Sequence, residues 1–130
     1  MSSNRTLNFP AVHFLRKVVS FDTADIATGV PMNAKLPNGA IVLFTTVNID
    51  TVFNAVSTNV LTVGTVSTAY NNLIAAGDVD ETTLGATTLT SKALKVAADT
   101  DVYIKYTQTG TAATTGAATV VVAYVPQSES

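Results

Sequence analysis

The residues best able to do chemistry are few in this chain, and the single histidine is the first of them. His13 lies within an apolar segment, Ala11 to Phe21, and the chain has no cysteine. A zinc site would need carboxylates for all its remaining ligands, which is an uncommon set. A Ser-His-Asp arrangement can assemble from distant residues, but no GxSxG elbow surrounds any serine here. We therefore expect a structural or surface histidine, no enzyme activity, no metal site and no cofactor.

Two acidic clusters are the other candidates for chemistry. Asp78 and Asp80 share a parity if the backbone is extended, so they could present two carboxylates to a cation such as calcium. The segment Asp78 to Glu81 lacks the length and the later glutamate of an EF-hand loop. Asp99 and Asp101 could likewise either bind a cation or cap a turn. We expect turns capped by aspartate in both places, with a cation at Asp78 to Glu81 as the open alternative.

Composition excludes several function classes. The 130 residues suffice for one domain, charged residues are only 12% of the chain, and the formal net charge is −2. A nucleic-acid-binding protein would show a basic stripe, and a membrane helix needs about 20 apolar residues in a row. Threonine, with 22 copies, supplies most of the polar surface. Uncharged hydroxyls suit an exposed sheet that other subunits later cover. We expect neither a nucleic-acid nor a membrane partner, and synthesis in the cytoplasm.

Short apolar segments separated by turn residues predict an all-β fold. The pattern indicates an antiparallel β-sandwich of the jelly-roll type with about eight strands. An immunoglobulin-like sandwich is the alternative, although tryptophan and cysteine are absent. At most one short helix is expected, at Thr68 to Ala76, where Tyr70, Leu73 and Ile74 have helical spacing.

Local signals refine this outline. Leu36 to Ala40, with Pro37 and Gly39 in it, is the strongest turn signal. Gly64, near the end of a strand, indicates a close backbone approach or a bulge. A bulge is also expected near Arg16 and Lys17, where the apolar residues change face.

The stretch from Asp99 to Pro126 predicts an antiparallel hairpin. Its two apolar runs, Val102 to Gln108 and Ala117 to Val125, flank a loop of Gly, Ala and Thr. Both faces of the second run are apolar, so we expect one face in the core and the other against a second subunit. The residues expected at this contact are Val121, Ala123 and Val125, or the opposite parity with Tyr124.

Residues 1–10 predict an N-terminal arm rather than a core element. The segment is polar, and Pro10 favours an extended backbone at Phe9. We expect the arm, through Arg5 and Phe9, to reach a neighbouring subunit. The domain organisation is therefore an arm at 1–10, a β-sandwich at 11–126 and a tail at 127–130.

Three blocks of sequence resemble a known family. They are GAIVLFTTVNIDTVFNAVSTNVLTVGT, AYNNLIAAGDVDETT and ADTDVYIKYTQTGTAATTGAATVVVAYVP. Together they are similar to small virion proteins of tailed bacteriophages, the capsid decoration or cement proteins with a jelly-roll fold. The resemblance covers roughly Arg16 to Pro126 and carries no catalytic signature. It implies a protein on the outside of the virion that binds the major capsid protein, as a homodimer or homotrimer, and stabilises the head. A tail or fibre module that binds a host receptor or glycan is the alternative.

Overall fold

The described residues form an all-β fold. The structure is a computed structural model that describes residues 12–90 and 94–126. Within these ranges there are eight strands and no helix. The strands are β1 (His13–Ser20), β2 (Val30–Pro31), β3 (Ile41–Thr51), β4 (Thr58–Gly64), β5 (Gly85–Leu89), β6 (Leu94–Lys95), β7 (Tyr103–Thr109) and β8 (Ala117–Val125). All pairings are antiparallel.

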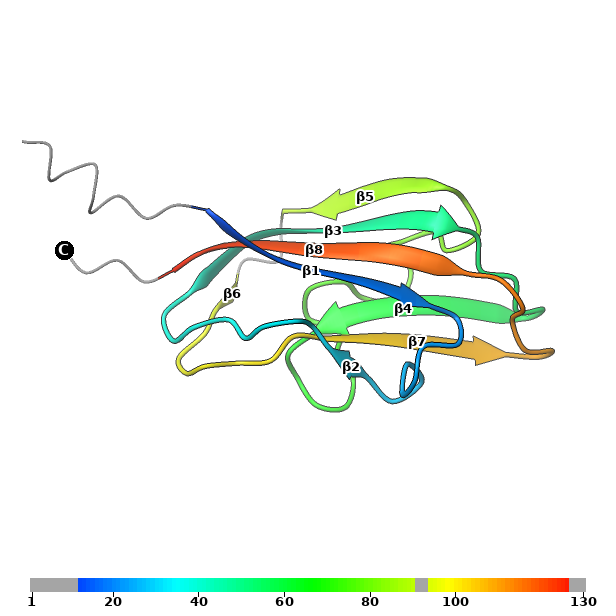
Figure 1. Ribbon diagram of the computed structural model, residues 1–130, viewed down its shortest axis with the longest axis horizontal. Coiled ribbons are helices and arrows are strands. Elements are labelled where there is room, and N and C mark those ends of the chain that lie inside the picture. The colour runs from blue at the N-terminus through cyan, green and yellow to red at the C-terminus, as the bar shows by residue number, and fades with distance from the viewer. Residues whose placement is uncertain (1–11, 91–93, 127–130) are drawn as a thin grey trace, which may run out of the picture.

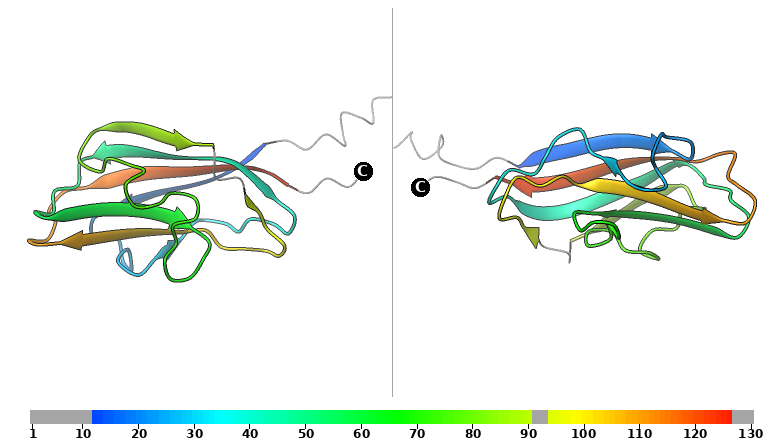
Figure 2. Two further views of the ribbon diagram at one scale, coloured as in Figure 1. Left: turned by 180° about the vertical axis from the view of Figure 1, so that it is seen from behind. Right: turned by 90° about the horizontal axis from the view of Figure 1, so that it is seen from below.

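Two sheets face each other as the layers of a sandwich (Figures 1 and 2). The five-stranded sheet has the order β1-β8-β3-β5, with β6 also paired to β3, and the three-stranded sheet has the order β2-β7-β4. β5 and β6 pair with successive parts of β3, so together they form one interrupted edge. The first, last and third strands are neighbours in one sheet, and the second, seventh and fourth in the other. This is the strand order of a jelly roll, as the sequence predicted.

The predicted hairpin between the last two strands is wrong. β7 lies between β2 and β4 in one sheet, whereas β8 lies between β1 and β3 in the other (Figure 1). The connecting residues 110–116 cross from sheet to sheet and are anchored elsewhere. Asn54 accepts hydrogen bonds from the backbone N–H groups of Thr114 and Thr115, and the Thr115 hydroxyl donates to the carbonyl of Val52. The loop also lacks the Asn-Gly or Asp-Gly pair that a two-residue hairpin turn prefers.

The segment considered for a helix, Thr68 to Ala76, is a loop packed on β4. Tyr70 has a positive φ of 45° and stacks on Tyr103 with ring centroids 4.5 Å apart. The backbone N–H groups of Leu73 and Ile74 both donate to the carbonyl of Val63. The three apolar residues therefore reach the core through strand-like contacts, and their spacing does not reflect a helix.

Gly64 confirms the predicted close approach. A Cβ atom at this position would meet the backbone of Tyr70 and Asn71, so the loop packs directly on the glycine. The turn at Leu36 to Ala40 is also confirmed, because Ala40 N–H donates to the Pro37 carbonyl at 3.0 Å and Gly39 has a φ of 87°.

The bulge predicted near Arg16 and Lys17 is wrong. The β1–β8 register is unbroken from His13 to Ser20, and the irregularities fall in β3, between Val42 and Phe44 and between Ile49 and Thr51. In β1 the change of face is only apparent: Leu15 and Val19 face the core, and Phe14 and Val18 face solvent.

The core lies between the two sheets. Phe53 and Tyr106 meet there with ring centroids 4.7 Å apart. Each sheet supplies alternate residues of its strands to this layer. The largest fully buried side chains are Tyr106, Phe53, Leu15, Leu36, Ile49, Leu61, Leu73, Ile74, Ile104, Val19, Val47 and Val63.

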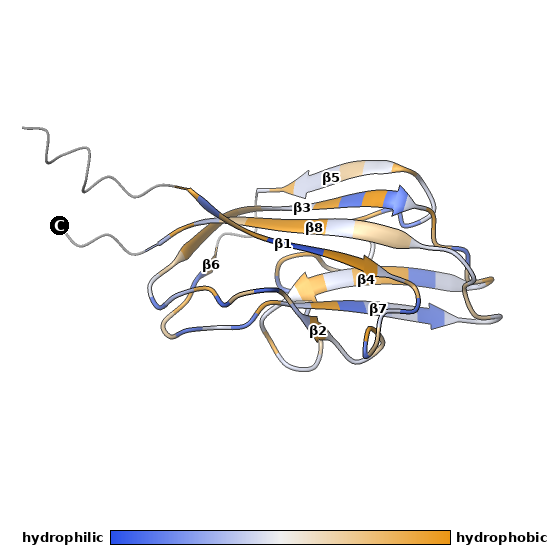
Figure 3. Ribbon diagram, in the orientation of Figure 1, coloured by the Kyte–Doolittle hydropathy of each residue, from blue (hydrophilic) through white to orange (hydrophobic). Residues whose placement is uncertain are grey.

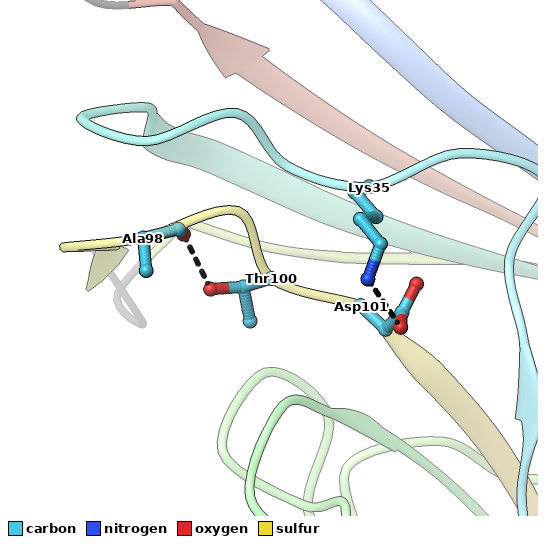
Figure 4. A network of polar contacts seen from close by, with 4 residues as sticks. All are labelled: Lys35, Ala98, Thr100 and Asp101. Carbon is cyan, nitrogen blue, oxygen red and sulfur yellow. Dashed lines mark hydrogen bonds and ion pairs between the residues drawn. The ribbon is translucent and has the colours of Figure 1, made fainter.

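A polar contact joins the segments that follow β2 and precede β7 (Figure 4). Lys35 Nζ lies 2.9 Å from Asp101 Oδ2, and the hydrogen bond to Asp101 raises the pKa of Lys35. The side chains are 57% and 33% exposed, so this surface pair adds little stability. Close by, the Thr100 hydroxyl donates to the Ala98 carbonyl, and Asp99 accepts a hydrogen bond from the backbone N–H of Asn38. These contacts of Asp99 and Asp101 join residues 99–101 to the distant residues 35–38, whereas the sequence predicted aspartates that cap a local turn.

Candidate functional site

The outer face of the five-stranded sheet is the candidate functional surface. Strand register places Phe14, Ala123 and Phe44 in one row across β1, β8 and β3, because each pairs with the next. Arg16, Val121 and Thr46 form the second row, and Val18, Thr119 and Asn48 form the third. Their neighbours of opposite parity, such as Leu15, Val120 and Val47, are buried in the core. The three rows therefore point away from the sandwich, and we call this surface the outer face.

The half of the outer face near the start of β1 is apolar. Phe14 is 58% exposed, Ile41 43% and Leu43 38%. The irregularity in β3 enlarges this area, because Val42 and Thr45 are both buried and leave the two residues between them, Leu43 and Phe44, on the outside. We call this the apolar half; Figure 3 colours all residues of these strands by hydropathy, core-facing and outward-facing alike. Its members are Phe14, Ile41, Leu43, Phe44, Val121, Ala123 and Val125.

The other half of the outer face has polar side chains around Asp50, together with the exposed Val18 of the third row. The Thr119 hydroxyl donates to Asp50 Oδ2 at 2.7 Å, and the Asn48 amide donates to Asp50 Oδ1 at 2.5 Å. The hydroxyls of Thr46 and Thr88 lie 2.8 Å apart in the same region. Asp50 is the one carboxylate in the described strands of this sheet. Its oxygens are thus fixed in position at the end of the face opposite the apolar half.

The outer face of the three-stranded sheet has a different character. In β7 the core-facing residues are Ile104 and Tyr106, whereas Tyr103, Lys105, Thr107 and Thr109 have the opposite parity, and Tyr103 is covered by the ring of Tyr70. A polar exposed sheet face is the normal condition of an antiparallel sandwich. Contiguous exposed apolar residues instead mark surfaces that bind other proteins. The asymmetry between the two outer faces therefore identifies the apolar half as the candidate contact surface.

The structure separates the two parities proposed for a subunit contact. Val121 and Ala123 lie on the outer face, and Val125 pairs with Ile41 at its apolar end. Ala123 is itself fully buried between its larger row neighbours. Tyr124 has the opposite parity, stacks on His13 with ring centroids 5.6 Å apart, and packs against the core. Arg5 and Phe9 lie outside the described residues.

Sequence reasoning missed half of this surface. Phe14, Ile41, Leu43 and Phe44 were not among the predicted contact residues, although the first three are exposed and Phe44 is half-buried. One signal was present, because the segment Ala40 to Ile49 is apolar on both parities as far as Phe44. A strand of that kind has two faces to cover.

The histidine and the acidic cluster that the sequence analysis weighed as catalytic or metal-binding candidates make contacts with neighbouring residues. His13 is exposed beside Tyr124. Asp78 accepts a hydrogen bond from the backbone N–H of Ala75, and Asp80 accepts from Thr82 and Thr83. The hydroxyl of Thr82, followed by that of Thr83, lowers the pKa of Asp80. Across residues 12–90 and 94–126, no three metal-ligating side chains come together.

Glu81 is the one buried carboxylate among the described residues. Its side chain is 6% exposed, and its Oε2 accepts a hydrogen bond from the backbone N–H of Leu61 at 2.9 Å. Burial raises the pKa of Glu81 despite this bond. Burial also raises the pKa of Tyr106, and the negative charge of Glu81 adds to that effect. The Tyr106 hydroxyl donates to Asn59, whose side chain bonds both backbone groups of Ala55.

Replacing Glu81 tests this buried site. Glu81→Ala leaves the Leu61 N–H without its acceptor, so we expect a loss of about 1–3 kcal/mol in the free energy of unfolding. Glu81→Gln keeps an acceptor and removes the charge, so its stability at pH 7 should match or exceed that of the wild type. Because the folded-state pKa of Glu81 is raised, the wild type binds more protons when folded and loses stability as pH rises from the unfolded pKa to the folded one.

Urea unfolding at pH 4 and pH 7 measures both effects. The wild type should gain stability relative to Glu81→Gln on acidification. An equal pH response in the two proteins would show that Glu81 titrates normally.

The described residues contain no helix long and apolar enough to span a membrane.

Comparison with known proteins points to bacteriophage capsids. A chain from the capsid asymmetric unit of the cyanophage Pam1 has this fold with a TM-score of 0.67 and is 27% identical; the match covers 91% of this chain and 86% of that chain. A chain from the acid-stable capsid of the Helicobacter pylori bacteriophage KHP30 matches with a TM-score of 0.63 and 17% identity, over 90% of each chain, which shows the shared fold. No protein-family model matches the sequence, and no curated protein does. The chain thus shares its jelly-roll sandwich with chains of two phage capsid structures.

Proposed function

We propose that this chain is a structural virion protein that binds the outer surface of a bacteriophage capsid and stabilises it as a decoration, or cement, protein. The observation that carries the proposal is the match to the Pam1 capsid chain, at 27% identity over 91% of this chain. The major capsid protein is then the principal partner and the exterior of the virion is the location.

The surface chemistry supports a static binding role. The outer face offers an apolar area flanked by uncharged hydroxyls, which cost less to desolvate than ions. A protein that binds only the assembled lattice stabilises that lattice by the free energy of binding, repeated at every site. On this proposal the chain has no enzyme activity and uses neither a cofactor nor nucleic acid.

Imaging of intact particles tests the proposal. We expect density for this chain on the outside of the head, and particles lacking the chain should lose DNA at a lower temperature than complete ones. Density at the tail alone would contradict the capsid role and favour the alternative of a tail or fibre module that binds a host receptor or glycan. Light scattering of the purified chain tests the homodimer or homotrimer, which a strict monomer at high concentration would contradict.

Removal of residues 1–9 tests the role proposed for the arm. The deletion stops before β1, so we expect the β-sandwich of residues 11–126 to keep its circular dichroism spectrum and melting temperature. Attachment to heads should weaken by about tenfold or more, the equivalent of about 1.4 kcal/mol. The measurement is occupancy on particles lacking the chain, with added protein titrated. Unchanged occupancy would show that the arm has no part in attachment.

A further inference from the structure

We propose that residues 5–9 of one copy of this chain lie along the outer face of a second copy, with Phe9 on the apolar half and Arg5 at Asp50. The inference deepens the proposed capsid role and rests on it for the supposition that copies of the chain meet on one lattice. The observations behind it are the pattern of the arm, the polarity of the outer face and the residues that join the arm to β1.

The arm has the pattern of a half-buried strand. In an extended backbone, Arg5, Leu7 and Phe9 share one side, whereas Thr6 and Asn8 share the other. The side with two apolar residues needs cover, and the threonine and asparagine side suits solvent. The apolar half of the outer face supplies matching cover, because its exposed residues include Phe14, Ile41 and Leu43.

The spacing of the arm matches the polarity of the outer face. Along β3 the face runs from Phe44 through Thr46 and Asn48 to Asp50. At roughly 3.3 Å per residue, Phe44 and Asp50 lie about 20 Å apart, and Phe9 and Arg5 about 13 Å apart. The long arginine side chain spans the remaining distance. With Phe9 over the row of Phe44, Leu7 therefore falls over the row of Thr46 and Val121, and the guanidinium of Arg5 reaches Asp50.

The charges on the outer face favour its Asp50 end for Arg5, because Arg16 lies in the second row and Lys95 pairs with Ile41 in the apolar half. Arg5 is the one charged residue among residues 1–10. Asp50 is the one carboxylate in the described strands of the five-stranded sheet, and Thr119 and Asn48 hold its oxygens in place. A guanidinium beside a fixed carboxylate forms a charge-assisted hydrogen bond. The pair therefore sets the direction in which the arm lies on the face.

The residues between the arm and β1 favour binding of the arm to a second copy rather than to the sheet of its own chain. β1 begins at His13, at the end of the sheet where the apolar half lies, since Phe14 belongs to the first row. To cover its own face, the chain would have to reverse just before β1. Tight reversals use Gly, Asn or Asp, whereas residues 10–12 are Pro, Ala and Val. Pro10 also favours an extended backbone at Phe9, so the sequence favours an arm that continues away from its own sheet.

Chemical crosslinking of the full chain tests the placement. The chain has no cysteine, so the introduced cysteines are the only thiols that the crosslinking reagent can join. A segment packed on a sheet lies about 10 Å from it, which exceeds the reach of a disulfide, so a short bismaleimide reagent is the probe. Leu7→Cys combined with Val121→Cys should give covalent species larger than one chain on a denaturing gel.

A matched pair of cysteines gives the control. Leu7→Cys combined with Thr107→Cys, on the outer face of the other sheet, should give at least fivefold less product. Crosslinking within single chains alone would place the arm on its own sheet and overturn the proposal. Equal yields for the two pairs, or no product from the first, would also overturn it.

Charge reversal tests the contact between Arg5 and Asp50. Arg5→Glu and Asp50→Lys should each weaken self-association about five- to tenfold in sedimentation equilibrium, since both remove the attraction and add repulsion. The double variant should return to within about threefold of the wild type. Absence of this rescue would refute the contact. Both experiments use the isolated chain, so a failure here leaves head binding to be decided separately by imaging.

Discussion

Alanine in place of Gly116 is expected to lower the free energy of unfolding by about 2–6 kcal/mol. Gly116 has a φ of 146°, a conformation that costs an L-residue about 1–3 kcal/mol. A Cβ atom here would also collide with the ring of Phe53, which is 1% exposed and packed on Tyr106. Moving a ring in a close-packed core costs about 1–3 kcal/mol more.

Gly85→Ala is the matched control for the effect at Gly116. Gly85 has a similar φ of 129°, but a Cβ atom there meets nothing within 4 Å. The free energy of unfolding of Gly85→Ala should fall by about 1–3 kcal/mol, from backbone strain alone. The difference between the two variants in urea unfolding measures the collision with Phe53. Equal losses would mean that the Phe53 ring moves aside freely and does not fix the loop at 110–116.

This loop is also where sequence reasoning failed most clearly. The sequence predicted both flanking strands closely, as Val102 to Gln108 and Ala117 to Val125, and the structure has β7 and β8 there. Strand existence follows from local apolar alternation, which a sequence displays directly. Strand pairing does not, because β8 has partners about a hundred and about seventy residues earlier, in β1 and β3. Adjacent strands pair often enough to make a hairpin the default expectation.

The loop at 68–76 illustrates a second limit. The spacing of Tyr70, Leu73 and Ile74 fits a helix face, yet the same residues reach the core from an irregular backbone. Periodicity reports which residues are buried and does not by itself report the backbone that buries them. The contact of this loop with Gly64 was predictable, because a glycine inside a strand indicates a close approach.

The outer face was half predictable for a similar reason. Val121 and Ala123 were expected at a contact because β8 is apolar on both parities. Which parity faces outward depends on register, and the register of β8 is set by β1 and β3. The exposure of Leu43 and Phe44 depends on the irregularity in β3, for which the sequence carries no glycine or other marker.

Aspartate in place of Phe14 is expected to abolish most assembly while leaving the fold intact. Phe14 is 58% exposed in the first row of the outer face, beside Ala123. Its side chain contributes little to the core, so the free energy of unfolding should change by less than about 1 kcal/mol. Truncation of a central aromatic anchor in an interface costs about 2 kcal/mol or more. A buried carboxylate adds a desolvation cost, so we expect at least about a 30-fold loss of affinity.

Two further variants show whether the loss reflects the outer face. Phe14→Leu keeps an apolar side chain and should retain assembly to within about fivefold. Thr107→Asp places the same charge on the exposed face of the other sheet and should leave assembly unchanged. Self-association by sedimentation and occupancy on heads by imaging are measured for all three proteins. If Phe14→Asp alone lost both self-association and occupancy on heads, the outer face would serve assembly as a whole. If it lost self-association but kept full occupancy, the outer face would contact other copies, and the capsid contact would lie elsewhere on the molecule. If Phe14→Asp kept both, the apolar half would not be a contact surface, and its exposed residues would require another explanation.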